Sequence, residues 1–433
     1  FAHDRGRPPR PLPKDSVVNP RLARLADPAR TYVTLQGAWA FLWALAFTLS
    51  LVYQVDVVGL TPFQLIVVGT VLEATCFLGE IPTGVVADVH SRKLSVVIGL
   101  VTIGLGVCVM AVPAFWAILA AQVVWGLGYT FVSGAAEAWV TDEVGEDAVQ
   151  PVFTRGHQVK LGMTIVGILA AGLLGQVALA WPIVAGGVGF VVLGAVMSLL
   201  MREDNFAPTP RGDRDTWGHL WATTREGLYA ATRHRVIRTF LLVGLLAGLT
   251  SEVLDRLWVD RIINHIGLPD LGTGDDVATW FTLFALAASL IGLIASLLAN
   301  RLAPAALNAE HPTRVMAVLV LVEAGGVALF ALAGNLGAAL AGKWTRDAAQ
   351  SVSWPVAHAW LNRTITNPGS RATTLSMMGQ ADAVGQIVGG PSLGMVASRA
   401  GVQTALLLAA AIQAPAAFLF ARLRSRSGKP ALP

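Results

Sequence analysis

Six charged side chains, whose charges sum to zero, lie inside two largely apolar stretches of the sequence. They are Glu252, Asp255 and Arg256 in 238–263, and Lys343, Arg346 and Asp347 in 336–361. Within each stretch a carboxylate and a cation stand four residues apart, which allows them to pair on one face of a helix. Such a polar network is able to gate a pathway, carry protons or contact a substrate. A static ion network that only fixes helix register is the alternative.

Four further acids lie in apolar stretches with no obvious local partner: Glu73, Glu80, Glu323 and Asp382. Loss of water favours the neutral form of a carboxyl group, which suits it to take up and release a proton near neutral pH. The candidates for proton coupling, in order of preference, are Asp382, Glu73, Glu252 and Asp347. For each of them, a protonated acid with a purely structural role is the alternative.

Aromatic and polar side chains recur together in three apolar stretches. They are Gln36, Trp39 and Trp43, then Gln122, Trp125, Tyr129 and Ser133, and finally Gln350, Trp354 and His358. Aromatic faces with a few polar groups suit an amphipathic small molecule better than a sugar or a phosphate. The alternative is that several of these rings only anchor or pack helices.

Twelve apolar stretches are each long enough to cross a bilayer, since about 20 residues of helix span about 30 Å of hydrocarbon. We place them at 32–55, 62–87, 94–112, 115–141, 159–179, 182–201, 238–263, 277–300, 315–333, 336–361, 373–397 and 402–421. The chain is 54% hydrophobic and only 13% charged, as in a membrane protein. The prediction is an all-α, multi-pass membrane protein.

Basic residues orient the chain in the membrane. Seven Lys and Arg residues lie in 1–31, seven in 202–238 and four in 422–433, and the remaining loops on that side add further pairs. By the positive-inside rule both termini are cytoplasmic. The predicted organisation is a tail (1–31), a six-helix bundle (32–201), a linker with an amphipathic helix (202–237), a second six-helix bundle (238–421) and a short tail (422–433).

Several other functions lack their sequence signals. The net charge of +4 is explained by orientation and gives no support for nucleic-acid binding. Cys76 and Cys108 both lie in spans, so we expect no disulfide, no metal site and no cofactor. The sequence contains no Walker loop, no H-E-x-x-H and no nucleophile elbow, so we expect no enzyme. The basic, proline-rich first thirty residues predict no cleavable signal peptide.

The loop after the second span carries a recognisable motif. It reads Gly84-Val-Val-Ala-Asp88-Val-His-Ser-Arg92-Lys93. This resembles the loop 2–3 signature of the major facilitator superfamily, with valine at 89 and serine at 91 where a basic residue and a glycine are usual. The segments 79–84 and 133–139 are similar to a bacterial exporter-like branch of that superfamily.

The resemblance implies two six-helix halves, a central pathway lined by spans 1, 4, 7 and 10, and a peripheral ninth span. It places the six-charge network in the outer half of the pathway, and it leads us to expect that Glu323 faces lipid. It also implies an inner gate, for which the residues are Gly84, Asp88, Arg92 and Lys93, with Glu80, Glu137 and Asp142 nearby. Two family features are missing: Gln122 stands where an arginine is usual, and the Gly-Pro pair lies in span 11.

The function implied is secondary transport by alternating access. We expect a monomer in the bacterial cytoplasmic membrane that exports a hydrophobic or amphipathic small molecule, such as an antibiotic or secondary metabolite, in exchange for protons. A proton-coupled importer of a small nutrient is the closest alternative. A receptor or scaffold that transports nothing would need a folded domain outside the membrane, and no loop is long enough to form one.

Overall fold

The computed structural model describes residues 27–208, 218, 225, 235–272, 275–309, 312–364 and 368–424, with side chains described for all of these except 364, 368–376 and 424. Most of the predicted N-terminal tail and most of the predicted amphipathic helix in the linker lie outside the described residues.

The first half of the chain forms a bundle of helices. They are α2 (Pro28–Phe47), α3 (Ser50–Val52), the π-helix η1 (Tyr53–Val57), α4 (Pro62–Val89), α5 (Arg92–Met110), α6 (Phe115–Val132), α7 (Ala135–Val144), α8 (Glu146–Gly175) and α9 (Ala180–Leu200). Local signals explain the boundaries. Thr61 and Gln64 form a capping box at the start of α4, and the Ser91 side chain caps α5.

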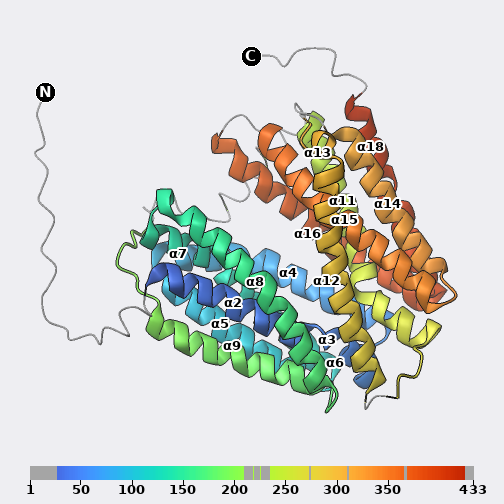
Figure 1. Ribbon diagram of the computed structural model, residues 1–433, viewed down its shortest axis with the longest axis horizontal. Helices are drawn as coiled ribbons and strands as arrows, with labels where there is room; N and C mark the ends of the chain where they lie inside the picture. Colours follow the sequence, from blue (N-terminus) through green and yellow to red (C-terminus); the bar gives the residue numbers. More distant parts are fainter. Residues whose placement is uncertain are drawn as a thin grey trace, which may run out of the picture.

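The second half repeats this plan. Its helices are α11 (Arg235–Arg261), the π-helix η3 (Ile262–Ile266), α12 (Asp276–Leu302), α13 (Pro304–Leu307), α14 (Thr313–Leu332), α15 (Leu336–Thr364), α16 (Pro368–Ala400), α17 (Val402–Gln413) and α18 (Pro415–Arg424). The two sets of helices form separate groups in the ribbon, blue to green and yellow to red (Figure 1).

Ten helical segments among the described residues are long and apolar enough to cross a membrane. α15 and α16 have 29 and 33 residues, which is long enough, but they carry more polar and charged side chains. For these two helices the crossing of the membrane stays a prediction. Several boundaries differ from those expected from the sequence; for example, the twelfth span is divided into α17 and α18. α8 begins at Glu146 rather than at 159, and Gly134, with a φ of 76°, divides the fourth span into α6 and α7.

Equivalent helices pack alike in the two halves. α5 crosses α6 at Gly99 and Gly128, and α14 crosses α15 at Gly326 and Gly342. The absence of Cβ atoms lets the paired backbones approach closely. A long side chain also caps the third helix of each half: the Tyr53 hydroxyl donates to the Ala111 carbonyl at 2.5 Å, and Arg261 donates to the Ala331 and Ala333 carbonyls at 2.9 and 3.3 Å.

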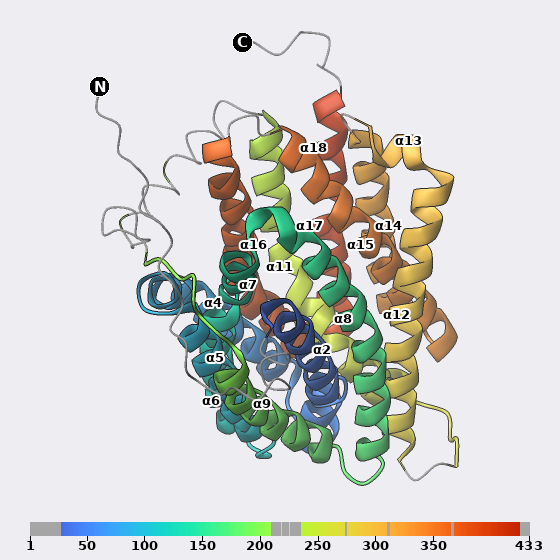
Figure 2. The same cartoon turned by 60° about the vertical axis from the view of Figure 1, so that its left-hand side comes forward.

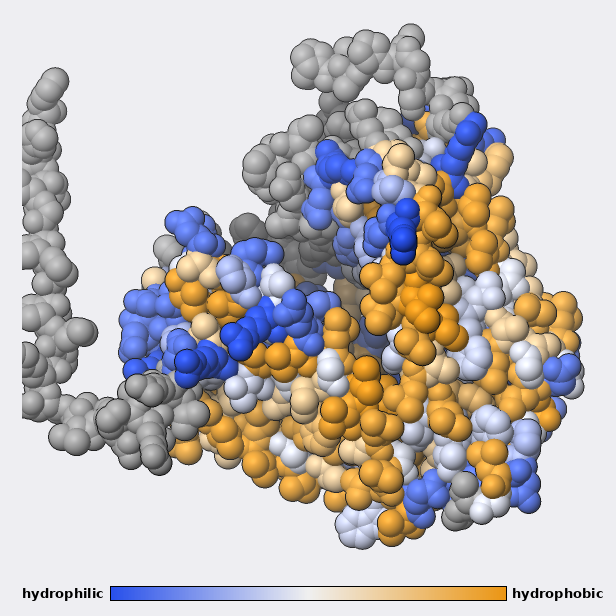
Figure 3. Space-filling view, in the orientation of Figure 1, coloured by the Kyte–Doolittle hydropathy of each residue, from blue (hydrophilic) through white to orange (hydrophobic). Residues whose placement is uncertain are grey.

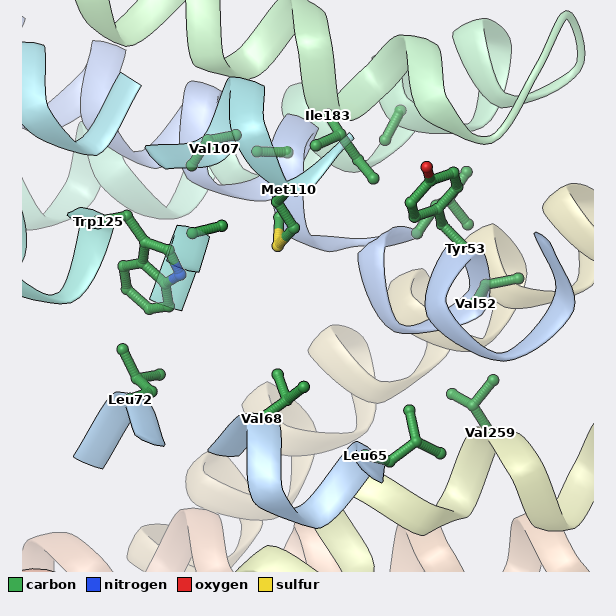
Figure 4. Close-up of a cluster of buried hydrophobic side chains, with 14 of the residues drawn as sticks. Val52, Tyr53, Leu65, Val68, Leu72, Val107, Met110, Trp125, Ile183 and Val259 are labelled. Atoms are coloured by element: carbon green, nitrogen blue, oxygen red, sulfur yellow. The ribbon is translucent and has the colours of Figure 1, made fainter. Parts of the chain in front are cut away.

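The two halves contact each other mainly near one end of the molecule. α4 packs on α16 and α11, and α8 packs on α12. The close approaches pair Thr70 with Gly390 and Gly172 with Thr282. We call this the closed end, formed by the start of α4, the end of α8, the start of α12 and the end of α16. Figure 4 shows that its core is apolar, with Leu65 of α4 beside Val259 of α11, both fully buried.

The opposite end, where α2 and α11 begin and α18 ends, is open. The two groups of helices diverge toward it in Figure 1. Figure 2 shows the same arrangement with the first half turned to the front, and the space-filling view shows a hollow between the groups (Figure 3). Glycines here lack neighbours: a Cβ on Gly84 of α4 or Gly162 of α8 would meet nothing within 4 Å. Large apolar side chains, such as Leu290 and Leu297 of α12, are exposed on the outer surface, as expected of a face covered by lipid.

Candidate functional site

The charged residues of α11 and α15 form one network that joins the two helices. Arg346 Nη2 lies 3.3 Å from Asp255 Oδ1, and its Nη1 donates to Asp347 Oδ1 at 3.2 Å. Lys343 Nζ donates to the other oxygen of Asp347 at 2.6 Å and lies 4.6 Å from the centre of the Trp258 ring. Ion pairs therefore form within α15, as the spacing of four residues allowed, and also between α15 and α11.

Asp347 holds two cations, so replacing it by asparagine is expected to destabilise the protein strongly. The side chains of Lys343, Arg346 and Asp347 are 12–17% exposed. Removal of one partner from such a buried network typically costs about 3–5 kcal/mol, because the charges left behind stay desolvated. Thermal unfolding in detergent, followed by intrinsic fluorescence, measures the loss. Asp270→Asn, on an exposed loop, is the control, and an equal midpoint for the two variants would contradict a stabilising network.

The pair of Glu252 and Arg256 lies at the junction of the two halves. Arg256 Nε donates to Glu252 Oε2 at 3.1 Å, and Glu252 is only 6% exposed. The pair packs against the bare backbone of α4, because a Cβ on Gly69 would stand 1.6 Å from Glu252 Oε2. Glycine at 69 is therefore what lets this ion pair reach the other half.

Three of the four proton-coupling candidates converge at this junction. Glu73 lies one helical turn beyond Gly69 on α4 and interacts electrostatically with Glu252 and Asp382. Asp382 accepts a hydrogen bond from Gln386 Nε2 at 2.8 Å, so it has a local partner that we did not expect. The backbone of α16 at Asp382 touches α11, where a Cβ on Gly248 would lie 2.0 Å from the Asp382 carbonyl oxygen. Asp347, the fourth candidate, belongs to the network described above.

Glu323 corrects an expectation from the sequence. We expected it to face lipid without a partner, because the ninth span is peripheral. Instead it is 8% exposed, and its two carboxylate oxygens accept hydrogen bonds from Ser353 Oγ at 2.6 Å and Gln413 Nε2 at 3.0 Å. The face of α14 that carries Glu323 is turned toward α15 and α17, which decides its environment.

The helices of the second half enclose a cavity of about 260 Å³. Glu323, Arg346, Gln350 and Asp382 are among the polar residues that line it. Trp354 and His358 stack on each other at 4.7 Å on its wall, and Trp354 remains 55% exposed. The predicted pathway residues of α15 are thus brought together with two of the acids for which the sequence showed no local partner.

A second cavity, of about 440 Å³, lies against the first half of the chain. Trp39, Trp43 and Tyr129 line it as expected, with Phe47 and Lys160, which we did not single out. The Trp39 and Trp43 rings are stacked with centroids 5.7 Å apart. This wall is aromatic and apolar apart from a few polar atoms.

Other predicted pathway residues lie elsewhere. Gln122 and Trp125 are 2% and 6% exposed and bond to each other, with the Trp125 indole donating to Gln122 Oε1 at 3.0 Å. They belong to the packed core of the first half because α5 covers this face of α6, so the structure does not place them on the wall. Gln36 is half-buried beside Gly156, and Ser133 is exposed at the break between α6 and α7.

The predicted inner gate lies at the open end. Arg92 pairs with Asp142 and donates to the Ala138 carbonyl at 2.8 Å, which ties the start of α5 to α7. Glu203, which the sequence reading missed, accepts hydrogen bonds from the Ser91 hydroxyl and from the backbone N–H of Lys93, the latter at 3.0 Å. Glu80 and Glu137 are exposed nearby. These contacts of Arg92 and Glu203 stay within the first half, as expected where the halves are apart.

Comparison with known proteins decides the family. The sequence model of the major facilitator superfamily matches residues 33–342. The chain belongs to the major facilitator superfamily. An uncharacterized MFS-type transporter of Bacillus subtilis (strain 168), YxaM, is 21% identical over 212 residues, which are 49% of this chain and 53% of YxaM. The chain thus matches about half the length of that relative.

Solved structures share the fold of this facilitator. The nucleoside transporter NupG superposes with a TM-score of 0.71 at 16% identity, covering 92% of this chain and 99% of NupG. A bacterial homolog of the human lysosomal transporter Spinster, in an inward-facing and unoccupied conformation, gives 0.68 at 14% identity, covering 96% and 100%. The chain thus belongs to a superfamily of membrane transporters rather than to a family of enzymes, and it shares the fold of these solved structures.

Proposed function

We propose that this facilitator exports a hydrophobic or amphipathic small molecule in exchange for protons, as a monomer in a bacterial cytoplasmic membrane. The positive-inside rule puts the open end in the cytoplasm. In that orientation a cytoplasmic substrate first meets two surfaces. These are the aromatic wall of Trp39, Trp43 and Tyr129, and the cavity beside Trp354. Such walls favour an amphipathic ligand.

The observation that carries the coupling proposal is the placement of three acids where the halves meet. Glu252 lies against Gly69, one turn before Glu73 on α4, and the backbone of Asp382 touches Gly248, one turn before Glu252 on α11. Carboxyl groups that share a desolvated site do not all ionise together, so a proton taken up by one changes the charge balance of the others. The junction between α4, α11 and α16 changes when the halves rock. Protonation at this point is therefore able to bias which end is open.

Proton flux in proteoliposomes tests the proposal. Amphipathic antibiotics are added on one side, and a trapped pH-sensitive dye reports proton movement. We expect the wild type to move protons in the direction opposite to the substrate. Asp382→Asn should abolish the substrate-dependent flux while leaving substrate binding in place, because it removes a titrating group without opening a gap. Asp270→Asn is the control for loss of an acid elsewhere and should retain the flux.

The alternatives give different results. Transport with no proton movement would contradict coupling and leave the buried acids as structural groups. Movement of substrate and protons in the same direction would instead support a proton-coupled importer. If the substrate-dependent proton flux is unchanged in Asp382→Asn, then Glu73 or Glu252 carries the coupled proton instead.

A further inference from the structure

The cavity of about 260 Å³ lies to one side of the junction between the halves. All of its lining residues come from α11, α14, α15, α16, α17 and α18, and none of the described residues that line it belongs to the first half. Its size is near the small end of the range of about 300–1,000 Å³ for ligand pockets. It is therefore a candidate binding site within one bundle, separate from a site shared by the two halves.

Negative charge predominates on the wall of this cavity. Glu323 is held by two neutral donors, Ser353 and Gln413, which orient its carboxylate but do not offset its charge. Asp382 lies on the same wall and is bonded to the neutral amide of Gln386. The lining guanidinium, Arg346, also attracts Glu323 electrostatically, but it is directly paired with two other carboxylates, Asp255 and Asp347, which are outside the lining set.

Aromatic rings supply the rest of the recognition surface. Trp354 and His358 stack on each other on the wall of the cavity, and the buried rings of Phe240 and Phe420 also line it. Faces of aromatic rings attract cations and pack on apolar groups. The cavity thus offers a buried carboxylate at one place and apolar, aromatic surface around it.

We propose that this cavity binds a small organic amine, with its ammonium group at Glu323 and its apolar body against Trp354 and the phenyl rings. An ammonium group adds further N–H donors to the Glu323 carboxylate, and it brings the positive charge that the neutral donors Ser353 and Gln413 do not carry. The role of this amine as the transported cargo rests on the proposed export function, whereas its binding does not.

The test is a binding assay on purified full-length protein in lipid nanodiscs, with three probes of the same shape. They are 2-phenylethylamine, the neutral 2-phenylethanol and the anionic phenylacetate, and tryptophan fluorescence reports binding. We expect the amine to bind the most tightly and phenylacetate not to bind. Glu323→Gln keeps the size of the side chain but removes its charge and one of its two acceptor oxygens. It should weaken binding of the amine by more than about tenfold, because a charge-assisted hydrogen bond is lost. It should leave phenylethanol unchanged.

Two further variants keep the test decisive. Ala357→Phe fills the cavity and should weaken the amine and the alcohol together, with Glu323 intact. Asp270→Asn should change neither. Equal affinity of the amine for the wild type and Glu323→Gln, or equal affinity of the wild type for amine and alcohol, would overturn the proposal. If Glu323→Gln fails to fold, amine binding that persists in Ala357→Phe would overturn it.

The outcomes separate this inference from the proposed function. Glu323-dependent binding of the amine without any transport in proteoliposomes would support the site and contradict the exporter. Proton-coupled export of antibiotics that is unaffected by Glu323→Gln, with no amine selectivity, would support the exporter and contradict the site.

Discussion

Replacing Gly326 by valine is expected to cost the protein much of its stability and to abolish transport. A Cβ at Gly326 would lie 2.8 Å from the backbone nitrogen of Arg346 and 2.8 Å from the Gly342 carbonyl oxygen. Backbone atoms in a helix cannot move aside as a side chain does, so α14 and α15 must separate. Overpacking of this kind typically costs about 1–3 kcal/mol and occasionally more. The separation would also displace Arg346 from Asp255.

The neighbouring glycine provides a matched control. Gly325 lies on the same helix, but a Cβ there would meet nothing within 4 Å. Gly325→Val therefore carries the same change in helix propensity without the clash. Thermal unfolding followed by size-exclusion chromatography should show a large loss for Gly326→Val and little change for Gly325→Val. Equal losses would mean that propensity, and not the crossing of α14 and α15, sets the stability.

The second large effect is expected at Gln176, which fastens the closed end. Its Nε2 donates to the Asp275 carbonyl at 3.0 Å and to Thr279 Oγ1 at 2.8 Å, and its Oε1 accepts from the Asp275 N–H at 3.0 Å. All three hydrogen bonds join α8 of one half to the start of α12 in the other. At about 0.5–1.5 kcal/mol each, their loss in Gln176→Ala should shift the population toward opening of this end by roughly tenfold or more.

Distances between spin labels measure this shift. Trp116 at the start of α6 and Leu271 in the loop before α12 are exposed and belong to different halves. With cysteine labels at these two positions, Gln176→Ala should add a population with a longer distance. Gln403→Ala, an exposed glutamine at the start of α17, is the control and should leave the distribution unchanged. An unchanged distribution in Gln176→Ala would show that the apolar core around Leu65 holds this end closed by itself.

Much of the helical layout could be predicted from the sequence. Each stretch that we expected to span the membrane contains a helix, because a run of apolar residues between polar loops is a local property. The misplaced boundaries have local causes that hydropathy does not record. The first turns of α8 are polar, so hydropathy did not mark them, and the break at Gly134 depends on a backbone angle rather than on composition.

The candidate site was predictable only as a set of residues, not as an arrangement. Charges in apolar stretches drew attention to Glu252, Asp347 and Asp382, and the α11–α15 network contains pairings that the i,i+4 spacing allowed. Gln413 and Glu203 went unnoticed. A lone glutamine in an apolar stretch is a weak signal, and an acid in a basic linker looks solvated until its partner is known.

The apolar segments, the positions of their charges and the family that the loop motif resembles can be read from the sequence, because they depend on residues close together in the chain. The folded arrangement was needed to show that Glu323 faces inward, that Gln122 is packed in the core and that the halves meet at one end. Those outcomes depend on the rotation of each helix about its axis. That rotation is set by close crossings such as Gly326 with Gly342 and Gly248 with Asp382, which join residues far apart in the sequence.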